Sequence, residues 1–315
     1  MTGASATAAA TEATPPWLGE FVLLAAVWGA SFLFMRVLGA EVGAIPTAGA
    51  RVALAALSLL PLMWLRKLWG VSRQHWRGML VVGLLNSALP FALYAWAVQS
   101  INTGLAAILN ASSPLFGAMV ARWWVGERLT ATRIAGLALG MAGVVALAGG
   151  QAEFKPGGTG WAVLACLGAS LSYGVAACYT REKLPGVPPL AIATSSQIAA
   201  ALLLAVPTAV LWPSHPLSAH AWGALVGAAV LCTALAYVLY FRLIARAGPA
   251  RAIAVTFLSP VFAVGYGALL LSEPITPRML LCGAVIVLGT ALATGLVGAR
   301  RRREDERVAR SKANG

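Results

Sequence analysis

Long runs of apolar residues, separated by short polar connections, recur along almost the whole chain. Crossing the hydrocarbon core of a bilayer takes a helix of about 20 mostly apolar residues. Runs of about that length cover 19–39, 45–65, 77–98, 102–124, 131–149, 159–180, 187–211, 220–243, 249–271 and 277–297. Because the connections between them are short, the pattern predicts an all-α integral membrane protein with ten transmembrane helices and no soluble domain.

The composition agrees with this pattern. Hydrophobic residues make up 59% of the chain and charged residues only 10%, whereas a soluble domain carries about 25% charged residues. The net charge of +13 could suggest a nucleic-acid partner, but the basic residues are scattered through short connections and one tail, with no basic domain. We therefore expect membrane lipids around the protein and no nucleic acid.

The positions of lysine and arginine predict the orientation of the helices. When the connections are assigned to alternate sides of the membrane, nearly all of the 23 basic residues fall on the side that holds both termini. The exceptions are Arg36, Arg51, Lys155 and Arg278. Since basic residues concentrate in cytoplasmic connections, both termini are expected in the cytoplasm.

The two halves of the chain repeat the same sequence features. Ser113-Pro114-Leu115-Phe116 corresponds to Ser259-Pro260-Val261-Phe262, and Pro114 and Pro260 are 146 residues apart. The same distance of 146 residues separates Glu127 from Glu273. Tandem hydrophobic repeats of this kind build many secondary transporters, whose substrate sites lie between the repeats.

The domain organisation follows from the repeat. We predict one repeat over 18–150 and the other over 151–298. Each holds five predicted helices, an odd number, so the second repeat would be inverted relative to the first. Residues 1–17 are rich in Ala and Thr and lack the charged region of a signal peptide, so we expect a disordered extension there. Residues 299–315 are expected to form a basic cytoplasmic tail.

Aromatic residues inside the predicted helices are candidates for a cavity wall. Trp28 and Phe32 lie on the first predicted helix, and Tyr173-Gly174 in the second half matches Trp28-Gly29. Trp28 lies about nine residues inside its run, short of either membrane interface. This depth favours a substrate pocket. The alternative is an interfacial aromatic beside a packing glycine.

Polar residues on the third and eighth predicted helices point to the same cavity. Asn86 and Tyr94 are spaced to share one helical face, and the eighth helix carries Thr233, Tyr237 and Tyr240. Polar side chains deep in a membrane are costly when they face lipid, so these faces should turn towards the bundle interior or a water-filled cavity. Hydrogen bonding between helices is the alternative.

The fourth and ninth predicted helices each carry a proline near the middle. Asn110 lies four residues before Pro114, and Thr256 lies four residues before Pro260. Each proline removes a backbone donor, which would free the carbonyl four residues earlier and kink the helix. Such helices suit a cavity wall or a gate. A kink that serves packing alone is the alternative.

The two glutamates of the repeat lie at helix ends. Glu127 precedes Thr130 and Glu273 precedes Thr276 by three residues, and either threonine could cap the next helix. We therefore expect connecting roles for both glutamates. No Asp or Glu occupies the middle of any run, so the chain offers no clear proton carrier, and transport down a gradient or with weak coupling is expected.

Small residues mark the fifth and tenth predicted helices. Gly136 and Gly140 form a GxxxG pattern followed by Gly143, and the tenth helix carries Gly283 and Gly289. Small residues allow close helix contacts, so these helices are expected to be a scaffold or a dimer face. The oligomeric state is left open, with a homodimer as one option.

Signatures of other chemistry are missing from the sequence. It has no GxxxxGK[ST] motif for ATP, no HExxH, no cluster of metal ligands, and no Ser/His/Asp set at compatible depths. The four cysteines lie inside apolar runs, where packing is the simplest function. We expect no cofactor, no metal and no enzyme activity.

Several features form an ordered set over residues 18–298: the paired repeats, the segment Trp28-Gly29-Ala30-Ser31-Phe32, Arg51 at the start of RVALAAL, and the paired Pro…Glu segments. This set resembles EamA-type members of the drug/metabolite transporter superfamily. The resemblance implies an exporter of the bacterial inner membrane, with a central cavity between the halves and alternating access. The chain is also similar to YddG-type amino-acid exporters, which implies aromatic or other neutral amino acids as cargo.

We therefore expect a secondary transporter that exports small polar or amphipathic metabolites, amino acids above all. The candidate substrate-binding residues are Trp28, Phe32, Asn86, Tyr94, Asn110, Tyr173, Tyr237 and Thr256, and the candidate kinks are Pro114 and Pro260. The lack of a buried countercharge favours a zwitterion or a neutral solute.

Other functions remain open from the sequence. One is a carrier for nucleotide sugars, nucleosides or lipid-linked sugars with the same architecture. Nucleotide sugars and lipid-linked sugars would need basic groups in the cavity, where Arg51 alone is a candidate. A membrane scaffold or an intramembrane enzyme is a further alternative. No pair of predicted helices carries catalytic groups at matching depth, as an enzyme would need, and a scaffold would not need paired proline kinks beside polar residues.

Overall fold

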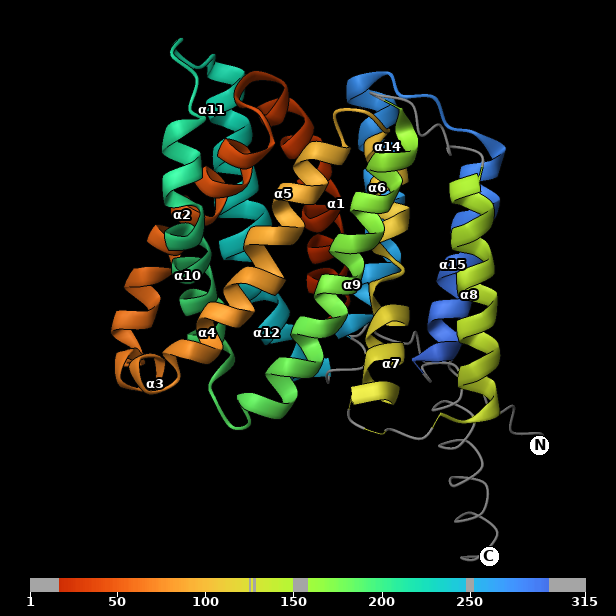
Figure 1. Cartoon of the computed structure of the whole chain (residues 1–315), viewed down its shortest axis with the longest axis horizontal. Helices are drawn as coiled ribbons and strands as arrows, with labels where there is room; N and C mark the ends of the chain where they lie inside the picture. Colours follow the sequence, from red (N-terminus) through yellow and green to blue (C-terminus); the bar gives the residue numbers. More distant parts are fainter. Residues whose placement is uncertain (1–16, 125, 127–128, 150–157, 248–251, 295–315) are drawn as a thin grey trace, which may run out of the picture.

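The computed structural model describes residues 17–124, 126, 129–149, 158–247 and 252–294, and within these residues the chain is helical, without strands (Figure 1). Eight spans are long and apolar enough to cross a bilayer: α1 (Leu18–Val42), α2 (Ala44–Leu65), α4–η1–α5 (Trp76–Ala97), α6–α7 (Thr103–Trp124), α8 (Ala131–Gly149), α9 (Thr159–Lys183), α10 (Pro189–Val210) and α11–η2–α12 (Ala219–Ile244). Two shorter apolar helices are α14 (Val255–Leu271) and α15 (Pro277–Ala293).

The all-α architecture is confirmed, and eight of the predicted runs are long helices while the last two are shorter. The bounds inside the composite spans, with the short helix α3, are α3 Trp69–Gln74, α4 Trp76–Gly83, η1 Leu84–Ala88, α5 Leu89–Ala97, α6 Thr103–Asn110, α7 Ser113–Trp124, α11 Ala219–Val226, η2 Gly227–Leu235 and α12 Ala236–Ala247. The expected extension up to Pro16, the expected tail over 299–315, and Glu127 lie outside the described residues.

The outer faces of the helices are apolar. Trp123 and Leu269, for example, are 82% and 83% exposed. So much exposed apolar surface would be unfavourable in water but suits contact with lipid tails. The chain is therefore a multi-pass membrane protein.

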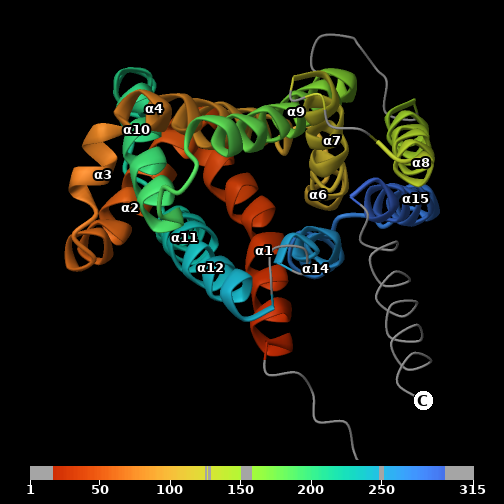
Figure 2. The same cartoon turned by 90° about the horizontal axis from the view of Figure 1, so that it is seen from below.

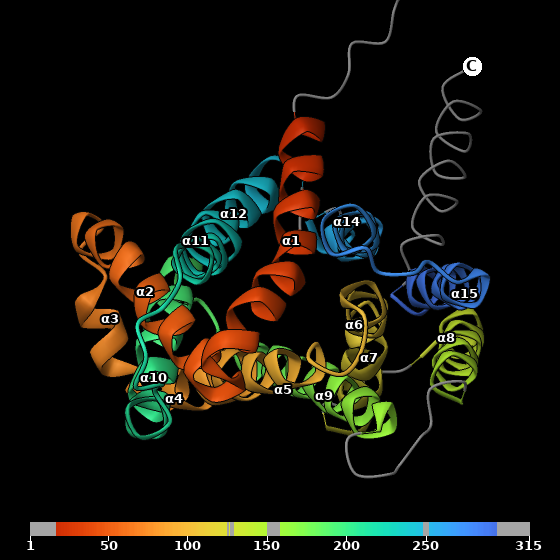
Figure 3. The same cartoon turned by 90° about the horizontal axis from the view of Figure 1, so that it is seen from above.

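The helices pack mainly in pairs. α1 lies against α14, α2 against α10, α8 against α15, and α9 against both α5 and α7. Figure 2 shows α8 and α15 side by side at one edge of the bundle, with α2, α3 and α10 at the opposite edge. Figure 3 shows the same arrangement from above.

Glycine permits the close approach of α8 and α15. A Cβ on Gly136 would lie 2.8 Å from the carbonyl oxygen of Gly289, and a Cβ on Gly289 would lie 2.8 Å from the carbonyl oxygen of Gly136. A Cβ on Gly143 would lie 2.9 Å from Ile286. The small-residue faces of these two helices are therefore used against each other within the chain, which agrees with a scaffold.

Two of the spans contain π-helical turns that the sequence pattern did not predict. In the first, η1, the turn comes just before Pro90, which has no N–H to donate to the carbonyl of Asn86. In the second, η2, the hydroxyl of Thr233 donates to the carbonyl of Ala228, five residues earlier, at 2.8 Å. Because a π turn is wider than an α turn, it changes which side chains face a neighbouring helix.

The two repeat prolines have different local structures. The span that contains Pro114 is interrupted, because α6 ends at Asn110 and α7 begins at Ser113. The carbonyl of Asn110 accepts a hydrogen bond from Ser113 Oγ at 2.7 Å, so it has a partner inside the chain. By contrast, α14 continues through Pro260 as one helix.

Candidate functional site

A cavity of ≈ 680 Å³ is lined by α1, α2, η1–α5, α6–α7, α9, η2–α12 and α14, with further residues from the start of α8 and the end of α15. The candidate substrate-binding residues from the sequence all line it: Trp28, Phe32, Asn86, Tyr94, Asn110, Tyr173, Tyr237 and Thr256. Pro114 also lines the cavity, whereas Pro260 is buried within α14 and is not part of the wall. The structure thus brings side chains from distant parts of the chain to one space, and their role in binding substrate stays a prediction.

Aromatic rings form much of the cavity wall. Phe32 meets Tyr94 edge to face with ring centroids 5.4 Å apart, and Tyr94 stacks against Tyr173 at 6.3 Å. On the side of α12, Trp28 packs against Tyr240 at 5.4 Å. Rings held by such contacts present a rigid apolar surface to a ligand.

Polar groups in the wall are already joined to one another. The Tyr94 hydroxyl donates to Asn110 Oδ1 at 2.9 Å and lies 3.0 Å from Ser170 Oγ. Asn86 Nδ2 donates to the Tyr237 hydroxyl at 3.2 Å. The sequence left two interpretations open for these residues, a cavity wall or hydrogen bonding between helices. The two are compatible, because the same side chains line the cavity and form hydrogen bonds between helices. An amide has more donors and acceptors than one such bond uses.

Arg51 is a cavity residue that the predicted site did not include. It lies well inside α2, is 3% exposed, and lines the cavity. Its Nε donates to Thr233 Oγ1 at 3.0 Å, and its guanidinium lies 3.9 Å from the centroid of the Phe91 ring. Its Nη1 is buried without a hydrogen-bond partner among the described residues. The positive charge at this depth was the signal in the sequence, where Arg51 was a candidate only for the alternative cargoes that need a basic group in the cavity.

One end of the cavity is lined by basic and small side chains. Arg133 at the start of α8, Arg181 near the end of α9, and Ala121 near the end of α7 belong to the wall there. Thr294 and Cys178 complete this end. Figure 1 shows α9 ending at the lower edge of the bundle, whereas α1 and α14 end at the upper edge. The cavity therefore reaches the end of the molecule that holds Arg133 and Arg181, which we call the open end.

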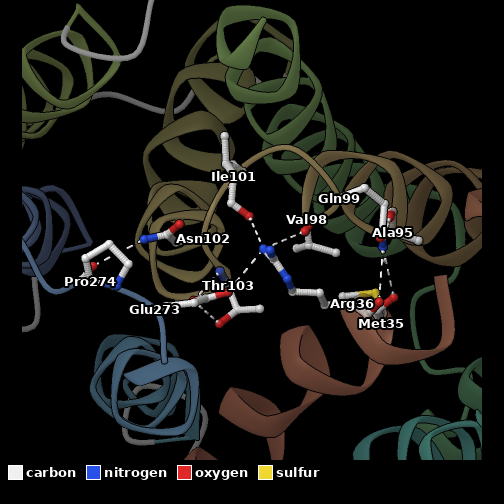
Figure 4. Close-up of polar contacts among 10 residues, drawn as sticks. All are labelled: Met35, Arg36, Ala95, Val98, Gln99, Ile101, Asn102, Thr103, Glu273 and Pro274. Atoms are coloured by element: carbon white, nitrogen blue, oxygen red, sulfur yellow. Dashed lines mark hydrogen bonds and ion pairs between the residues drawn. The ribbon is translucent and has the colours of Figure 1, made fainter. Parts of the chain in front are cut away.

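The opposite end is closed by an ion-pair cluster that does not line the cavity (Figure 4). Arg36 Nη1 lies 3.2 Å from Glu273 Oε1 and donates to the carbonyl oxygens of Val98 and Ile101, both at 3.0 Å. Glu273 Oε2 accepts hydrogen bonds from Thr103 N at 2.9 Å and Thr103 Oγ1 at 2.8 Å. We call this the closed end. Here one carboxylate joins α1, the start of α6 and the connection after α14.

Glu273 therefore has a connecting role, as the sequence predicted. Its carboxylate lies at the N-terminus of α6, where the backbone N–H groups and the helix dipole favour a negative charge. The capping threonines are also confirmed, because Thr276 Oγ1 accepts from Met279 N at 3.2 Å and Thr130 Oγ1 accepts from Arg133 N at 3.4 Å. What the sequence did not predict is the pairing of Glu273 with α1 and α6.

Within the described part of the chain, no three His, Cys, Asp or Glu residues gather into a group that could hold a metal ion. The four cysteines are buried free thiols.

Comparison with known proteins gives four findings. The model of the EamA-like transporter family matches residues 17–149 and again residues 160–295. A "probable terminal-alkyne amino-acid exporter" from Streptantibioticus cattleyicolor is 28% identical over 296 residues, 89% of this chain and 94% of the relative. The uncharacterized inner membrane transporter YedA of Escherichia coli (strain K12) is 28% identical over 295 residues, 89% of this chain and 90% of the relative. A solved crystal structure shares the fold, with a TM-score of 0.63 and 22% identity over 90% of this chain and 98% of that one.

Proposed function

This chain is a member of the EamA-like transporter family, and we propose that it is a secondary transporter of the bacterial inner membrane that exports aromatic and other neutral amino acids. The observation that carries this proposal is the cavity, where aromatic rings adjoin amide and hydroxyl groups. Its volume of ≈ 680 Å³ lies within the range of about 300–1,000 Å³ that is usual for small-molecule sites. The Streptantibioticus relative, described as a "probable terminal-alkyne amino-acid exporter", supports the choice of cargo.

The proposed topology is ten transmembrane helices in two inverted repeats. Reciprocal packing supports it. Gly29 on α1 packs against α14, where a Cβ would lie 2.7 Å from Phe262 Cβ. Gly174 on α9 packs against α7, where a Cβ would lie 2.7 Å from Gly117 N. The two glycines are 145 residues apart in the chain. The contact of α1 with α14 and the contact of α9 with α7 are therefore equivalent under the proposed repeat.

The proposed orientation places both termini in the cytoplasm, as the distribution of Lys and Arg favours. Under this orientation the open end faces the cytoplasm, and the cluster of Arg36 and Glu273 faces the periplasm. A cavity open to the cytoplasm is the state in which an exporter takes up its cargo. Alternating access would then require the closed end to separate while the open end closes.

We further propose that transport is facilitative. Among the described residues, the cavity wall contains no Asp, Glu or His side chain. Glu273, the buried carboxylate of the closed end, interacts with Arg36 and Thr103 and does not line the cavity. Proton-driven transporters usually place a titratable group inside the membrane on the substrate path.

A second candidate is a carrier of phosphorylated sugars, such as nucleotide sugars. The observation in its favour is the presence of three arginines in the cavity wall, Arg51 in the middle and Arg133 and Arg181 at the open end. Arginine is well suited to phosphate oxygens. Several arginines in contact with one ligand would distinguish this class from amino acids.

The test is counterflow of radiolabelled L-phenylalanine and other neutral amino acids into proteoliposomes of the purified protein, with and without a pH gradient. Counterflow that is independent of the gradient is expected. Accumulation driven by the gradient would overturn the facilitative mechanism. A folded protein that exchanges no amino acid but does exchange nucleotide sugars would replace the first candidate with the second.

A further inference from the structure

Arg51 is a buried cation without a carboxylate partner in the described structure. The acidic residues that the structure describes are Glu20, Glu41, Glu182 and Glu273. Each is engaged elsewhere: Glu20 with Arg242 and Arg246, Glu41 with Ser218, Glu182 with Arg181, and Glu273 with Arg36. A guanidinium cannot lose its charge in a protein, so Arg51 remains charged with no carboxylate counterion among the described residues.

Burying a lone charge is costly, and the protein compensates only in part. The Phe91 ring beneath the guanidinium provides a cation–π contact at 3.9 Å. Thr233 accepts one hydrogen bond from Nε. Arginine has five N–H donors, and Nη1 is buried with no partner among the described residues. Arg51 therefore has donor capacity that its surroundings leave unused.

The position of the guanidinium is fixed in advance of any ligand. The guanidinium carbon lies over the Phe91 ring, and Thr233 Oγ1 accepts the hydrogen bond from Nε. Thr233 is itself held, because its hydroxyl donates to the carbonyl of Ala228 within η2. The π-helical turn thus places the acceptor that orients Arg51 towards the cavity. A planar, oriented guanidinium matches a carboxylate, which can accept two parallel hydrogen bonds from it.

We propose that Arg51 binds the carboxylate of the transported solute, and this inference rests on the proposed function as an amino-acid exporter. The aromatic wall around Phe32, Tyr94 and Tyr173 then receives the apolar side chain of the solute. The amino group has no carboxylate to meet among the described wall residues, so ring faces and amide oxygens are its partners. The carboxylate of the solute is required and its amino group is dispensable.

This assignment differs from a structural role for Arg51. If Arg51 served only to join α2 to η2 through Thr233, its removal would weaken the exchange of all solutes to the same degree. If Arg51 instead binds a carboxylate, its removal weakens the exchange of solutes that have a carboxylate more than that of solutes that lack one. The readout that distinguishes the two roles is therefore selectivity, rather than activity.

The experiment measures how three unlabelled compounds compete with labelled L-phenylalanine in counterflow: L-phenylalanine itself, 3-phenylpropionate, which lacks the amino group, and phenethylamine, which lacks the carboxylate. For the unmodified protein, 3-phenylpropionate should compete within about tenfold of L-phenylalanine, and phenethylamine should be weaker by a further 10- to 100-fold, as expected for a lost charged hydrogen bond. Equal competition by 3-phenylpropionate and phenethylamine would overturn the proposal.

The matched variants are Arg51→Met, Arg51→Lys and Arg73→Met. Arg51→Met should raise the half-saturating concentration of L-phenylalanine about tenfold or more and remove the difference between the acid and the amine. Arg51→Lys should restore part of that difference, because it keeps the charge but not the planar fork. Arg73→Met removes an exposed arginine of α3 outside the cavity and should behave as the unmodified protein. Unchanged selectivity in Arg51→Met would contradict the assignment.

Two further outcomes have their own tests. If Arg51→Met does not fold, Arg51→Lys takes its place, and equal competition by the acid and the amine in the unmodified protein still overturns the proposal. If the unmodified protein exchanges no amino acid, the proposed function fails, and the Arg51 proposal is judged by binding of 3-phenylpropionate and phenethylamine to the purified protein. Tighter binding of 3-phenylpropionate than of phenethylamine would support a carboxylate subsite for another cargo. Equal binding of the two would overturn the Arg51 proposal.

Discussion

The two ends of the cavity differ in how they are built, although corresponding parts of the proposed repeats contribute to both. At the closed end, Gly104 and Gly267 let α6 and α14 approach, and Glu273 joins them to Arg36. At the open end, the residue that corresponds to Gly267 is Ala121, 146 positions earlier, and its side chain lines the cavity. At the closed end, the glycine backbone of α6 and of α14 contacts side chains of the other helix. At the open end, the corresponding residue faces the cavity instead.

This difference suggests how the closed end could open. A seal made only of apolar side chains would expose apolar surface to water on opening. The cluster at the closed end is made largely of ionised and backbone groups, which water can hydrate once they separate. We therefore expect the closed end to be stable enough to exclude solute yet able to open within the transport cycle.

The largest effect is expected from filling the glycine at the closed end. A Cβ on Gly267 would lie against the Glu273 carboxylate and 2.6 Å from Thr103 Oγ1. Overpacking of about 1–3 kcal/mol corresponds to a shift of about 5- to 150-fold between two conformations. Gly267→Val should open this end, and Ala121→Val, at the corresponding position, should not.

The measurement is labelling of Met35→Cys by a membrane-impermeant maleimide added from outside the cell, in a variant without the native cysteines. Met35 lines the cavity and is 2% exposed. Labelling should rise in Gly267→Val and stay low in Ala121→Val. Equal labelling in both would show that the two ends do not differ in the way proposed.

A smaller effect is expected from the ion pair. Glu273→Gln keeps an oxygen that can accept from Thr103 but removes the charge opposite Arg36. Because the Arg36 side chain is 33% exposed and the Glu273 side chain 8% exposed, solvent reduces the coupling to about 1 kcal/mol. External labelling of Met35→Cys should rise several-fold in Glu273→Gln and further in Glu273→Ala. A double-mutant cycle with Arg36→Gln should show that the two effects are not additive, and simple additivity would remove the pair from the gate.

The residues of the site that could be predicted lie deep inside apolar spans and at equivalent positions of the two halves of the chain. Asn110 and Thr256 occupy equivalent positions before the two prolines, and both line the cavity. Trp28 and Tyr173, which also occupy equivalent positions, line it as well. Polar and aromatic side chains in the middle of an apolar span have few favourable places other than an interior cavity. This physical constraint acts on each residue separately, so a single sequence reveals it.

The parts that could not be predicted depend on partners far away in the chain. Glu273 contacts Arg36 and Thr103, and nothing in its own segment indicates either contact. The π turn at η2 depends on a local change of hydrogen bonding that leaves no apolar pattern. The sequence named Arg51 only as a basic candidate for the alternative cargoes, because the rule for charged connections describes the ends of helices and does not apply to a cation inside one. Its burial required the three-dimensional contacts with Phe91 and Thr233.

The smallest effect is expected at the open end. Arg181 lines the cavity there, but its side chain is 50% exposed, and its Nε lies 3.6 Å from Glu182 Oε1. Exposed charges contribute about 0–1 kcal/mol, and at physiological salt they are screened over about 8 Å. Arg181→Gln should therefore change the half-saturating concentration for counterflow by no more than about fivefold, with a smaller change at high salt. Arg36→Gln, at the closed end, should reduce flux more strongly and with little dependence on salt. If Arg181→Gln proves the more damaging substitution, the arginine at the open end is part of a gate as well, and the two ends are equivalent in function despite their different packing.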